Sequence, residues 1–309
     1  VIEPIRGAFK MCPLTRKKPI KKNSDAIDII KKLVFSATSI DTYVACPARF
    51  YFKYVLKLKE KENIKEDMEG IDIGKFLHDL LENAFSQFLF RKPEINKEFE
   101  KKLFAHLDRE FDKVFLKKMK ADSFMTRAVL HDRLSEFLQN ERIRSVQKLL
   151  CLEQVFEGSI NIGEEKFIFT AKLDRIDELA NKELLIIDYK SGTTAKLPSK
   201  KTDKLLALNS REKIRDYVRS FQLPLYIYIL EQGGKFSGND INAALYNLRD
   251  IELDYLWKKE DKSTRKRLLD IYIDALQFIL KEMIDPNIPF CPDDEERFCK
   301  YCPYYLMCR

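Results

Sequence analysis

Four consecutive large aliphatic residues at positions 184–187 run directly into Asp188, Tyr189 and Lys190. A short, β-branched apolar run of this kind is typical of a buried β-strand. Side chains alternate along a strand, so Asp188 and Lys190 point to the same face. Because charged groups at the end of a buried strand cost free energy unless they have partners, we expect this strand to end in a functional site.

A second carboxylate is expected beside this strand. Asp174 lies near the end of the preceding predicted strand, and a hairpin would bring it close to Asp188. Two adjacent carboxylates repel each other unless a cation lies between them, and hard divalent cations such as Mg²⁺ and Mn²⁺ prefer oxygen ligands. The metal would activate water and stabilise charge on a phosphate, and Lys190 would orient the water or neutralise the transition state. The alternative is a surface hairpin with ordinary ion pairs.

The rest of the chain predicts a mixed α/β fold in which helices come first, a mainly antiparallel sheet follows, and helices return. Residues 1–34 are basic and irregular and are interpreted as an arm or linker, and residues 35–309 as one domain with a helical insertion at about 91–150. Ser39 is expected to cap the first helix. The expected helices are residues 39–55, 71–90, 97–150 (broken near 121–123), 217–231 and 258–282, and the expected strands are residues 152–160, 166–176, 183–189 and 241–248.

Charge and hydropathy narrow the range of partners. The chain has 56 Lys and Arg against 49 Asp and Glu, a net charge of +7 that permits a polyanionic partner without requiring one. A Lys-rich loop at residues 196–204 follows the charged strand and is either a contact for a phosphate backbone or an ordinary solvated loop. No apolar stretch is long enough to span a bilayer and no secretory signal is visible, so we expect a cytoplasmic protein with no membrane partner.

Four motifs together resemble the RecB-type branch of the PD-(D/E)XK nucleases. They are Gly74-x₃-His78-x₃-Glu82, Asp174-Arg175-Ile176-Asp177, Ile187-Asp188-Tyr189-Lys190-Ser191-Gly192 and Gln222-x₃-Tyr226. The resemblance implies a nuclease core with a mixed central sheet flanked by helices, here carrying the helical insertion. The family usually has a glycine near the position of Ala171 or Lys172, and this chain has none there.

The resemblance also implies roles for individual residues. The implied metal ligands are His78, Asp174, Asp188 and the backbone carbonyl of Tyr189. Lys190 matches the catalytic lysine, Gln222 and Tyr226 match a motif that organises the site and contacts DNA, and Glu153 matches a supporting acidic position more loosely. Without this context, His78 would be an ordinary boundary residue of an amphipathic helix, and Gln222 and Tyr226 an ordinary pair on one helix face.

The cysteines suggest a second site. Four of the seven lie in the last nineteen residues, which does not suit a secreted disulfide framework. Cys299, Cys302 and Cys308 follow a Cys-x₂-Cys-x₅-Cys spacing, for which Cys46 is the natural fourth ligand and Cys291 a competitor. This set resembles the iron–sulfur nucleases of the same family, including the AddB-type helicase–nuclease subunit, and implies a 4Fe–4S cluster that joins the first helix to the tail. A Cys₄ zinc site and a set of free thiols are the alternatives.

These expectations describe Mg²⁺- or Mn²⁺-dependent hydrolysis of DNA phosphodiester bonds, with single-stranded DNA attacked from an end during recombination or repair. No Walker A sequence occurs, so a helicase partner, in another part of a longer chain or in another subunit, would supply the motor. Two alternatives remain: a DNA-binding module with an inactive site, and a CRISPR-adaptation nuclease. The second type is typically shorter, and the long helical insertion argues against it.

Overall fold

A computed structural model describes residues 18–59, 67–119, 122–192, 197–201, 208–236, 238–293, 295, 299 and 302–308. Residues 1–17 of the expected arm, and Lys196 and Lys204 of the expected Lys-rich loop, lie outside this range. The α-helices are α1 (Ser24–Lys31), α2 (Ala37–Ala45), α3 (Pro47–Phe50), α4 (Asp67–Phe85), α5 (Lys97–Met119), α6 (Asp122–Ile143), α8 (Arg211–Val218), α9 (Gln222–Gln232) and α10 (Lys262–Ile284). The strands are β1 (Val34–Phe35), β2 (Val146–Ile162), β3 (Glu165–Leu179), β4 (Leu184–Lys190), β5 (Ile241–Asn247) and β6 (Glu252–Tyr255).

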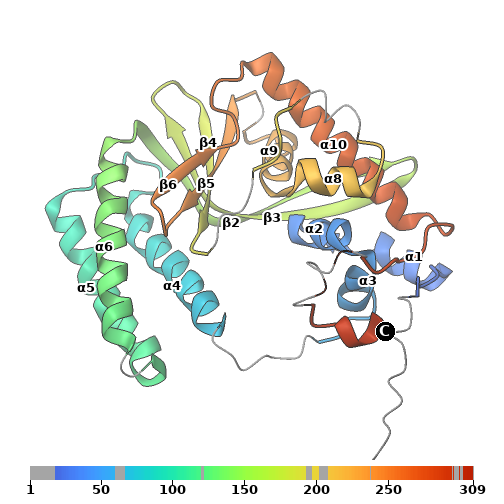
Figure 1. Ribbon diagram of the computed structural model, residues 1–309. Coiled ribbons are helices and arrows are strands. Elements are labelled where there is room, and N and C mark those ends of the chain that lie inside the picture. The colour runs from blue at the N-terminus through green and yellow to red at the C-terminus, as the bar shows by residue number, and fades with distance from the viewer. Residues whose placement is uncertain are drawn as a thin grey trace, which may run out of the picture.

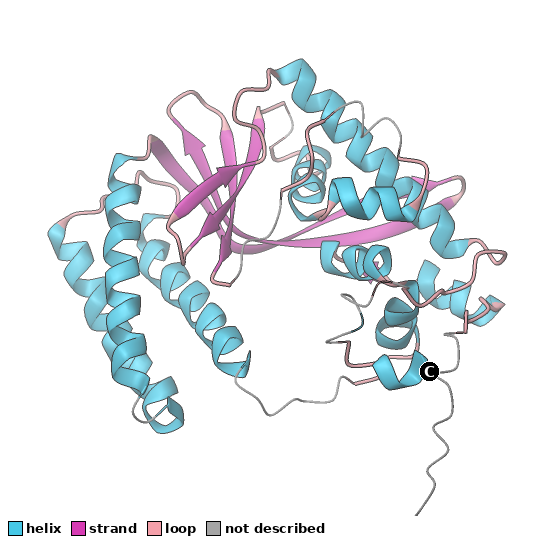
Figure 2. Ribbon diagram, viewed as in Figure 1, coloured by secondary structure: helices cyan, strands magenta, loops and turns pink. Residues whose placement is uncertain are grey.

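The strands form one mixed sheet with the order β1-β3-β4-β5-β6, and β2 pairs with β3. β3 pairs antiparallel with both β2 and β4, while β4 and β5 are parallel. The long hairpin of β2 and β3 extends well beyond the other strands (Figure 2). This mixed sheet flanked by helices confirms the fold class predicted from the sequence.

Different helices cover the two faces of the sheet (Figure 1). Leu185 and Ile187 of β4 pack in one core with α4, α5 and α6. Leu184 and Ile186 pack in a second core with α1, α2, α8, α9 and α10. Both faces of β4 are therefore buried, which explains why its sequence is a continuous apolar run rather than an alternating one.

The structure has a helix, α1, within the segment expected to be irregular, and the helix predicted over 39–55 also differs. Ser36, not Ser39, caps α2: its side chain accepts from the backbone N–H of Ser39, and the Ser39 hydroxyl oxygen accepts from the backbone N–H of Ser36. The helix also stops at Cys46, whose backbone is extended, and a new helix begins at Pro47. Proline lacks an N–H and disfavours helical geometry in the residue before it, so the predicted single helix over 39–55 was wrong. A π-helical segment, Tyr51–Val55, completes the region.

Other boundaries differ as well: the helix expected over 71–90 is α4, Asp67–Phe85, and the helix expected over 258–282 is α10, Lys262–Ile284. The helical prediction through residue 150 was wrong, because α6 ends at Ile143 and β2 begins at Val146, where pairing with β3 takes over. The helix predicted over 217–231 is two helices, α8 and α9, separated by a turn at Arg219. α5 and α6 occupy most of the segment interpreted as an insertion, and they pack on each other and on α4.

Segments from the two ends of the described chain lie side by side. Ile20 and Phe290 exchange two backbone hydrogen bonds of 3.1 and 2.8 Å. The Tyr304 hydroxyl donates to the carbonyl of Leu58 at 2.8 Å. In Figure 1 the C-terminal segment accordingly lies next to α3. None of the described helices is both long and apolar enough to cross a membrane.

Candidate active site

Asp174 and Asp188 lie on neighbouring strands, as the sequence predicted. Both residues are buried, and Asp174 Oδ2 accepts a 2.7 Å hydrogen bond from the backbone N–H of Tyr189. The antiparallel β3–β4 pairing sets Arg175 opposite Ile187, so the next residues along the two strands, Asp174 and Asp188, lie beside each other. The hairpin thus brings two carboxylates to the end of the central strand.

His78 approaches these carboxylates from α4. Its Nε2 lies 3.2 Å from the carbonyl oxygen of Tyr189, and its Nδ1 lies 3.3 Å from Glu153 and 3.5 Å from Asp174. The possible ligand atoms of His78, Glu153 and Asp174 all lie within 4.8 Å of one another. Burial alone would lower the pKa of His78, but hydrogen bonds to Asp174 and Glu153 outweigh it and raise the pKa to about 10. The site therefore attracts positive charge.

Glu153 reaches this group through an irregularity in β2. The register with β3 shifts between Leu149 and Cys151, and the backbone of Glu153 has a positive φ of 45°. A non-glycine residue in this region is strained unless its surroundings enforce the conformation. The Glu153 carboxylate also forms a 2.6 Å ion pair with Lys172. Glu153 thus reaches His78 from a part of β2 whose backbone is irregular.

Lys190, Gln222 and Asp188 form a closed set of contacts. Gln222, at the start of α9, donates to Asp188 Oδ1 at 2.7 Å and accepts from Lys190 Nζ at 3.0 Å. Lys190 Nζ also lies 2.7 Å from Asp188 Oδ2. The Gln222 amide donates to the Tyr226 hydroxyl at 2.9 Å, one helical turn further along. The structure thus brings together every residue that the sequence placed at the site.

The donors present fit a hard divalent cation. Burial raises the pKa of Asp188 to about 6, with Lys190 opposing the shift and Asp174 adding to it. No described residue makes a hydrogen bond of good geometry to the buried Asp188 Oδ2, despite the nearby Lys190 ammonium. Carboxylate oxygens, a carbonyl oxygen and one imidazole are the ligand types that suit Mg²⁺ or Mn²⁺.

A buried ionic cluster beneath the site was not foreseen. Arg175 forms ion pairs with Asp177 at 2.7 Å and Glu141 at 2.9 Å, and Arg144 pairs with both of these acids. Period-two alternation could have indicated it, because Arg175 and Asp177 share the strand face opposite Asp174. Glu141, on α6, and Arg144, which follows it, could not be identified in this way, because no local pattern connects this region with β3.

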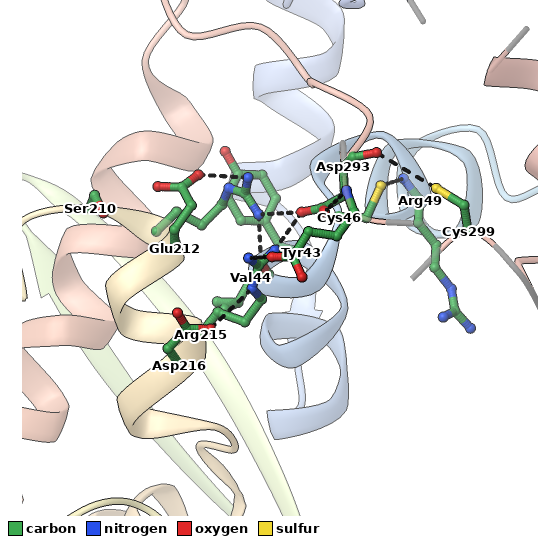
Figure 3. A network of polar contacts seen from close by, with 12 residues as sticks. Tyr43, Val44, Cys46, Arg49, Ser210, Glu212, Arg215, Asp216, Asp293 and Cys299 are labelled. Atoms are coloured by element: carbon green, nitrogen blue, oxygen red, sulfur yellow. Dashed lines mark hydrogen bonds and ion pairs between the residues drawn. The ribbon is translucent and has the colours of Figure 1, made fainter. Parts of the chain in front are cut away.

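The cysteines meet at a separate place, beside α3. Cys46 packs with Ala48, Phe52 and Tyr304, and Cys302 and Cys308 lie against this small cluster. Burial, with neighbouring Cys46 and Cys299, raises the pKa of Cys302. Figure 3 shows Cys46 and Cys299 close together at this junction. Cys291 is nearby, since its carbonyl accepts from the backbone N–H of Ala48 at 3.3 Å.

Neighbouring strands each present an aspartate, a helix presents a histidine to them, and a lysine lies two residues beyond the second aspartate. This combination is typical of one class of nucleases. The chain belongs to the PD-(D/E)XK nuclease superfamily, whose family model matches residues 34–309.

Three relatives are each named as one component of an ATP-dependent helicase/deoxyribonuclease. The protein of Carboxydothermus hydrogenoformans is 24% identical over 58% of this chain and 18% of its own length. That of Acetivibrio thermocellus is 24% identical over 62% of this chain and 18% of its own length. That of Thermoanaerobacter sp. strain X514 is 23% identical over 89% of this chain and 30% of its own length. The matched region thus spans less than a third of each relative.

Proposed function

We propose that this chain is a metal-dependent DNA nuclease that hydrolyses phosphodiester bonds. The observation that carries the proposal is the meeting of Asp174, Asp188 and His78 with Lys190 at the end of β4. Acidic ligands beside a fixed ammonium group are the parts that this hydrolysis needs.

Each residue has a proposed role in this reaction. The proposed ligands of Mg²⁺ or Mn²⁺ are His78, Asp174, Asp188 and the carbonyl of Tyr189. A bound divalent cation would supply an activated water and stabilise negative charge on the phosphate. Lys190 orients the attacking water or neutralises the phosphate, while Gln222 and Tyr226 hold Lys190 and Asp188 in place and face the DNA. Glu153 supports the orientation of His78, to which it is hydrogen-bonded.

The proposed substrate is single-stranded DNA attacked from an end, in the cytoplasm, during recombination or repair. The names of the relatives, which pair a helicase with a deoxyribonuclease, support both the DNA substrate and a helicase partner. The sequence contains no Walker A motif, so this segment would act beside a separate motor.

The test is digestion of end-labelled single- and double-stranded DNA with Mg²⁺, Mn²⁺ or EDTA. We expect cleavage of single strands that needs the metal and proceeds from an end. DNA binding without metal-dependent cleavage would instead identify an inactive binding module. Labels at the 5′ and 3′ ends, and a circular substrate, determine polarity and separate exonuclease from endonuclease action.

We further propose that residues 35–309 form one nuclease unit with its insertion at about 91–150. Of the arm or linker expected at residues 1–34, α1 belongs to the same folded unit, because Ala26 and Ile30 pack in its core. Within this unit, Cys46, Cys299, Cys302 and Cys308 hold a 4Fe–4S cluster. The support is that Cys46, Cys302 and Cys308 lie at one small apolar cluster although Cys46 is remote in sequence, and that Cys299 is a neighbour of Cys302. A zinc ion on the same four thiolates is the competing proposal.

A further inference from the structure

The helix that presents Gln222 begins in an unusual way. Its N-cap residue, Phe221, has no side-chain hydrogen bond to offer. The preceding turn is a γ-turn: Arg219 has φ 63° and ψ −52°, and the N–H of Ser220 donates to the carbonyl of Val218 at 2.7 Å. Turns of this hand are rare and strained, and such strain persists only where surrounding contacts enforce it.

Those contacts come from Asp41 on α2. Asp41 Oδ2 accepts from the Ser220 hydroxyl at 2.7 Å, and Oδ1 accepts from the backbone N–H of Phe221 at 3.0 Å. The Ser220 oxygen in turn accepts from the N–H of Gln222 at 3.2 Å. A side chain 180 positions earlier in the sequence thus accepts the N–H of the N-cap residue Phe221, and it holds the Ser220 hydroxyl that accepts the first N–H of α9.

Burial of the Asp41 carboxyl group costs free energy. The residue is half-buried, but neighbours enclose its carboxyl group, and this burial raises its pKa to about 6. A serine or aspartate at position 221 could cap α9 locally without burying a charge on another helix. Capping alone therefore does not explain Asp41. What it adds is a fixed position for the start of α9 relative to α2.

The position of that start matters because Gln222 is the first residue of α9. Its amide contacts Asp188 and Lys190 at 2.7 and 3.0 Å. Catalytic rates fall steeply when reacting groups are misplaced by about 1 Å. Any shift of the turn at Ser220 is thus passed directly to the two groups proposed to carry out the chemistry.

We propose that Asp41 is a positioning residue for the nuclease reaction: it holds the strained turn before α9 and so places Gln222 against Asp188 and Lys190. The proposal rests on the nuclease function proposed above. Asp41 itself acts through Ser220 and Gln222 and has no role in contacting DNA or metal.

Contacts with α8 hold α2 in place, so that Asp41 on α2 can fix the turn before α9. Arg211 of α8 donates to the carbonyl of Val44 at 2.7 Å, near the end of α2. Arg215, on the same helix, pairs with buried Asp293 at 2.5 Å, and Figure 3 shows Arg215 beside Val44. α2 is thus fixed to α8 at one end, and Asp41 fixes it to the following turn.

The test compares Asp41→Asn with Gln222→Ala and with the double variant, measuring kcat and KM on end-labelled single-stranded DNA at saturating Mg²⁺. Asp41→Asn keeps the shape of the side chain but loses an acceptor, and we expect kcat to fall about tenfold while KM and Mn²⁺ affinity stay within about twofold. Since Asp41 acts through Gln222, the double variant should be no slower than Gln222→Ala alone.

Glu282→Gln is the matched control. It makes the same carboxylate-to-amide change at another residue that contacts α2. Glu282, on α10, accepts from the hydroxyl of Tyr43, on α2, at 3.1 Å. We expect it to lower thermal stability as Asp41→Asn does, with unchanged kcat. If Asp41→Asn does not fold, Ser220→Ala provides the milder test, with an expected loss of roughly three- to fivefold in kcat.

Three results would overturn the proposal. Asp41→Asn and Ser220→Ala could both retain wild-type kcat. The losses from Asp41→Asn and Gln222→Ala could multiply, which would indicate a merely structural role. Glu282→Gln could lose as much kcat as Asp41→Asn at equal stability. Each result leaves the nuclease function intact, whereas a wild-type protein with no metal-dependent cleavage removes the proposed function and this inference together.

Discussion

At the scale of single residues, the site gathers three carboxylates, whose cationic neighbours are His78, Lys190 and Lys172. Asp174, Asp188 and Glu153 lie around His78 and Lys190. Without a metal, a proton on His78 supplies part of the missing positive charge, which is why its pKa rises to about 10. A divalent cation and that proton therefore compete for the same place.

This competition predicts pH-dependent metal binding. Between pH 7 and 9, metal-free His78 is protonated, so binding through its ring must release about one proton and Mn²⁺ affinity should rise about tenfold per pH unit. Below about pH 6 the dependence should steepen, because Asp188 must also lose a proton. Calorimetric titration in two buffers of different ionisation enthalpy measures the release. Constant affinity across this range would show that His78 is no ligand, and His78→Ala should bind weakly with little pH dependence.

Lys190 should matter for the chemical step and little for folding. Lys190→Ala removes an ammonium group that acts on the transition state, so we expect cleavage to fall on the order of a hundredfold or more. Binding of single-stranded DNA in the presence of Ca²⁺ should change little. Lys182→Ala, at an exposed lysine paired with Glu178, is the matched control and should cleave normally. Cleavage by Lys190→Ala at the wild-type rate would rule out the proposed role.

How much of the site could be predicted depends on what local spacing can encode. The alternation in β4 gave Asp188 and Lys190 their common face, and the hairpin brought in Asp174. The motif around His78 indicated its place, although no periodicity could show which strand it would meet. The role of Asp41 could not be predicted from the sequence, because its contact with Ser220 depends on how α2 packs beside the turn before α9.

At the scale of elements, the link between the α6 helix and the sheet is ionic as well as apolar. Arg175 is fully buried between Asp177 and Glu141, and its guanidinium lies 4.7 Å from the centre of the Phe85 ring. Replacing one partner of a buried ion network leaves the others without compensation. That loss is usually much larger than the net contribution of the pair itself.

Arg175→Met should therefore destabilise the protein strongly. Methionine fills similar space but leaves Asp177 and Glu141 with Arg144 alone, so we expect the free energy of unfolding to fall by about 3–5 kcal/mol. Urea unfolding at neutral pH measures it. Arg142→Met, at the surface of α6, should lower the free energy of unfolding by less than about 1 kcal/mol. Equal effects of the two changes would mean that the buried network contributes no more than a surface ion pair.

Element boundaries were predicted least well where tertiary pairing decides them. Residues 146–150 carry a pattern that a helix or a strand could use, and the long pairing with β3 selects the strand. The break at Cys46 could have been predicted from the sequence, because Pro47 follows it. β4 was the clearest element, since burial on both faces left no ambiguity in its sequence.

At the scale of the whole molecule, the cysteine site joins segments from both ends of the described chain. If it holds a 4Fe–4S cluster, anaerobically purified protein should be brown with about four irons and four sulfides per chain. Cys46→Ser should lose the colour as fully as Cys302→Ser and should lower the melting temperature, because the link between α2 and the tail is lost.

Cys291→Ser is the control and should keep the colour. A Cys46→Ser protein with full iron and sulfide, alongside a colourless Cys291→Ser protein, would move the fourth ligand into the tail. Stoichiometric zinc without sulfide, in protein never exposed to air, would favour the zinc site instead.

The hydrogen bond from Tyr304 to Leu58 joins residues 246 positions apart, and it has a consequence for how the protein is made. At about 5–20 residues per second, a ribosome needs roughly 12–50 s to synthesise the intervening chain. Throughout that time the aromatic surface around Phe52 lacks the cover that Tyr304 later provides. Chaperones that shield apolar nascent segments would bind there, and a chain truncated before Tyr304 would keep this surface exposed to proteases.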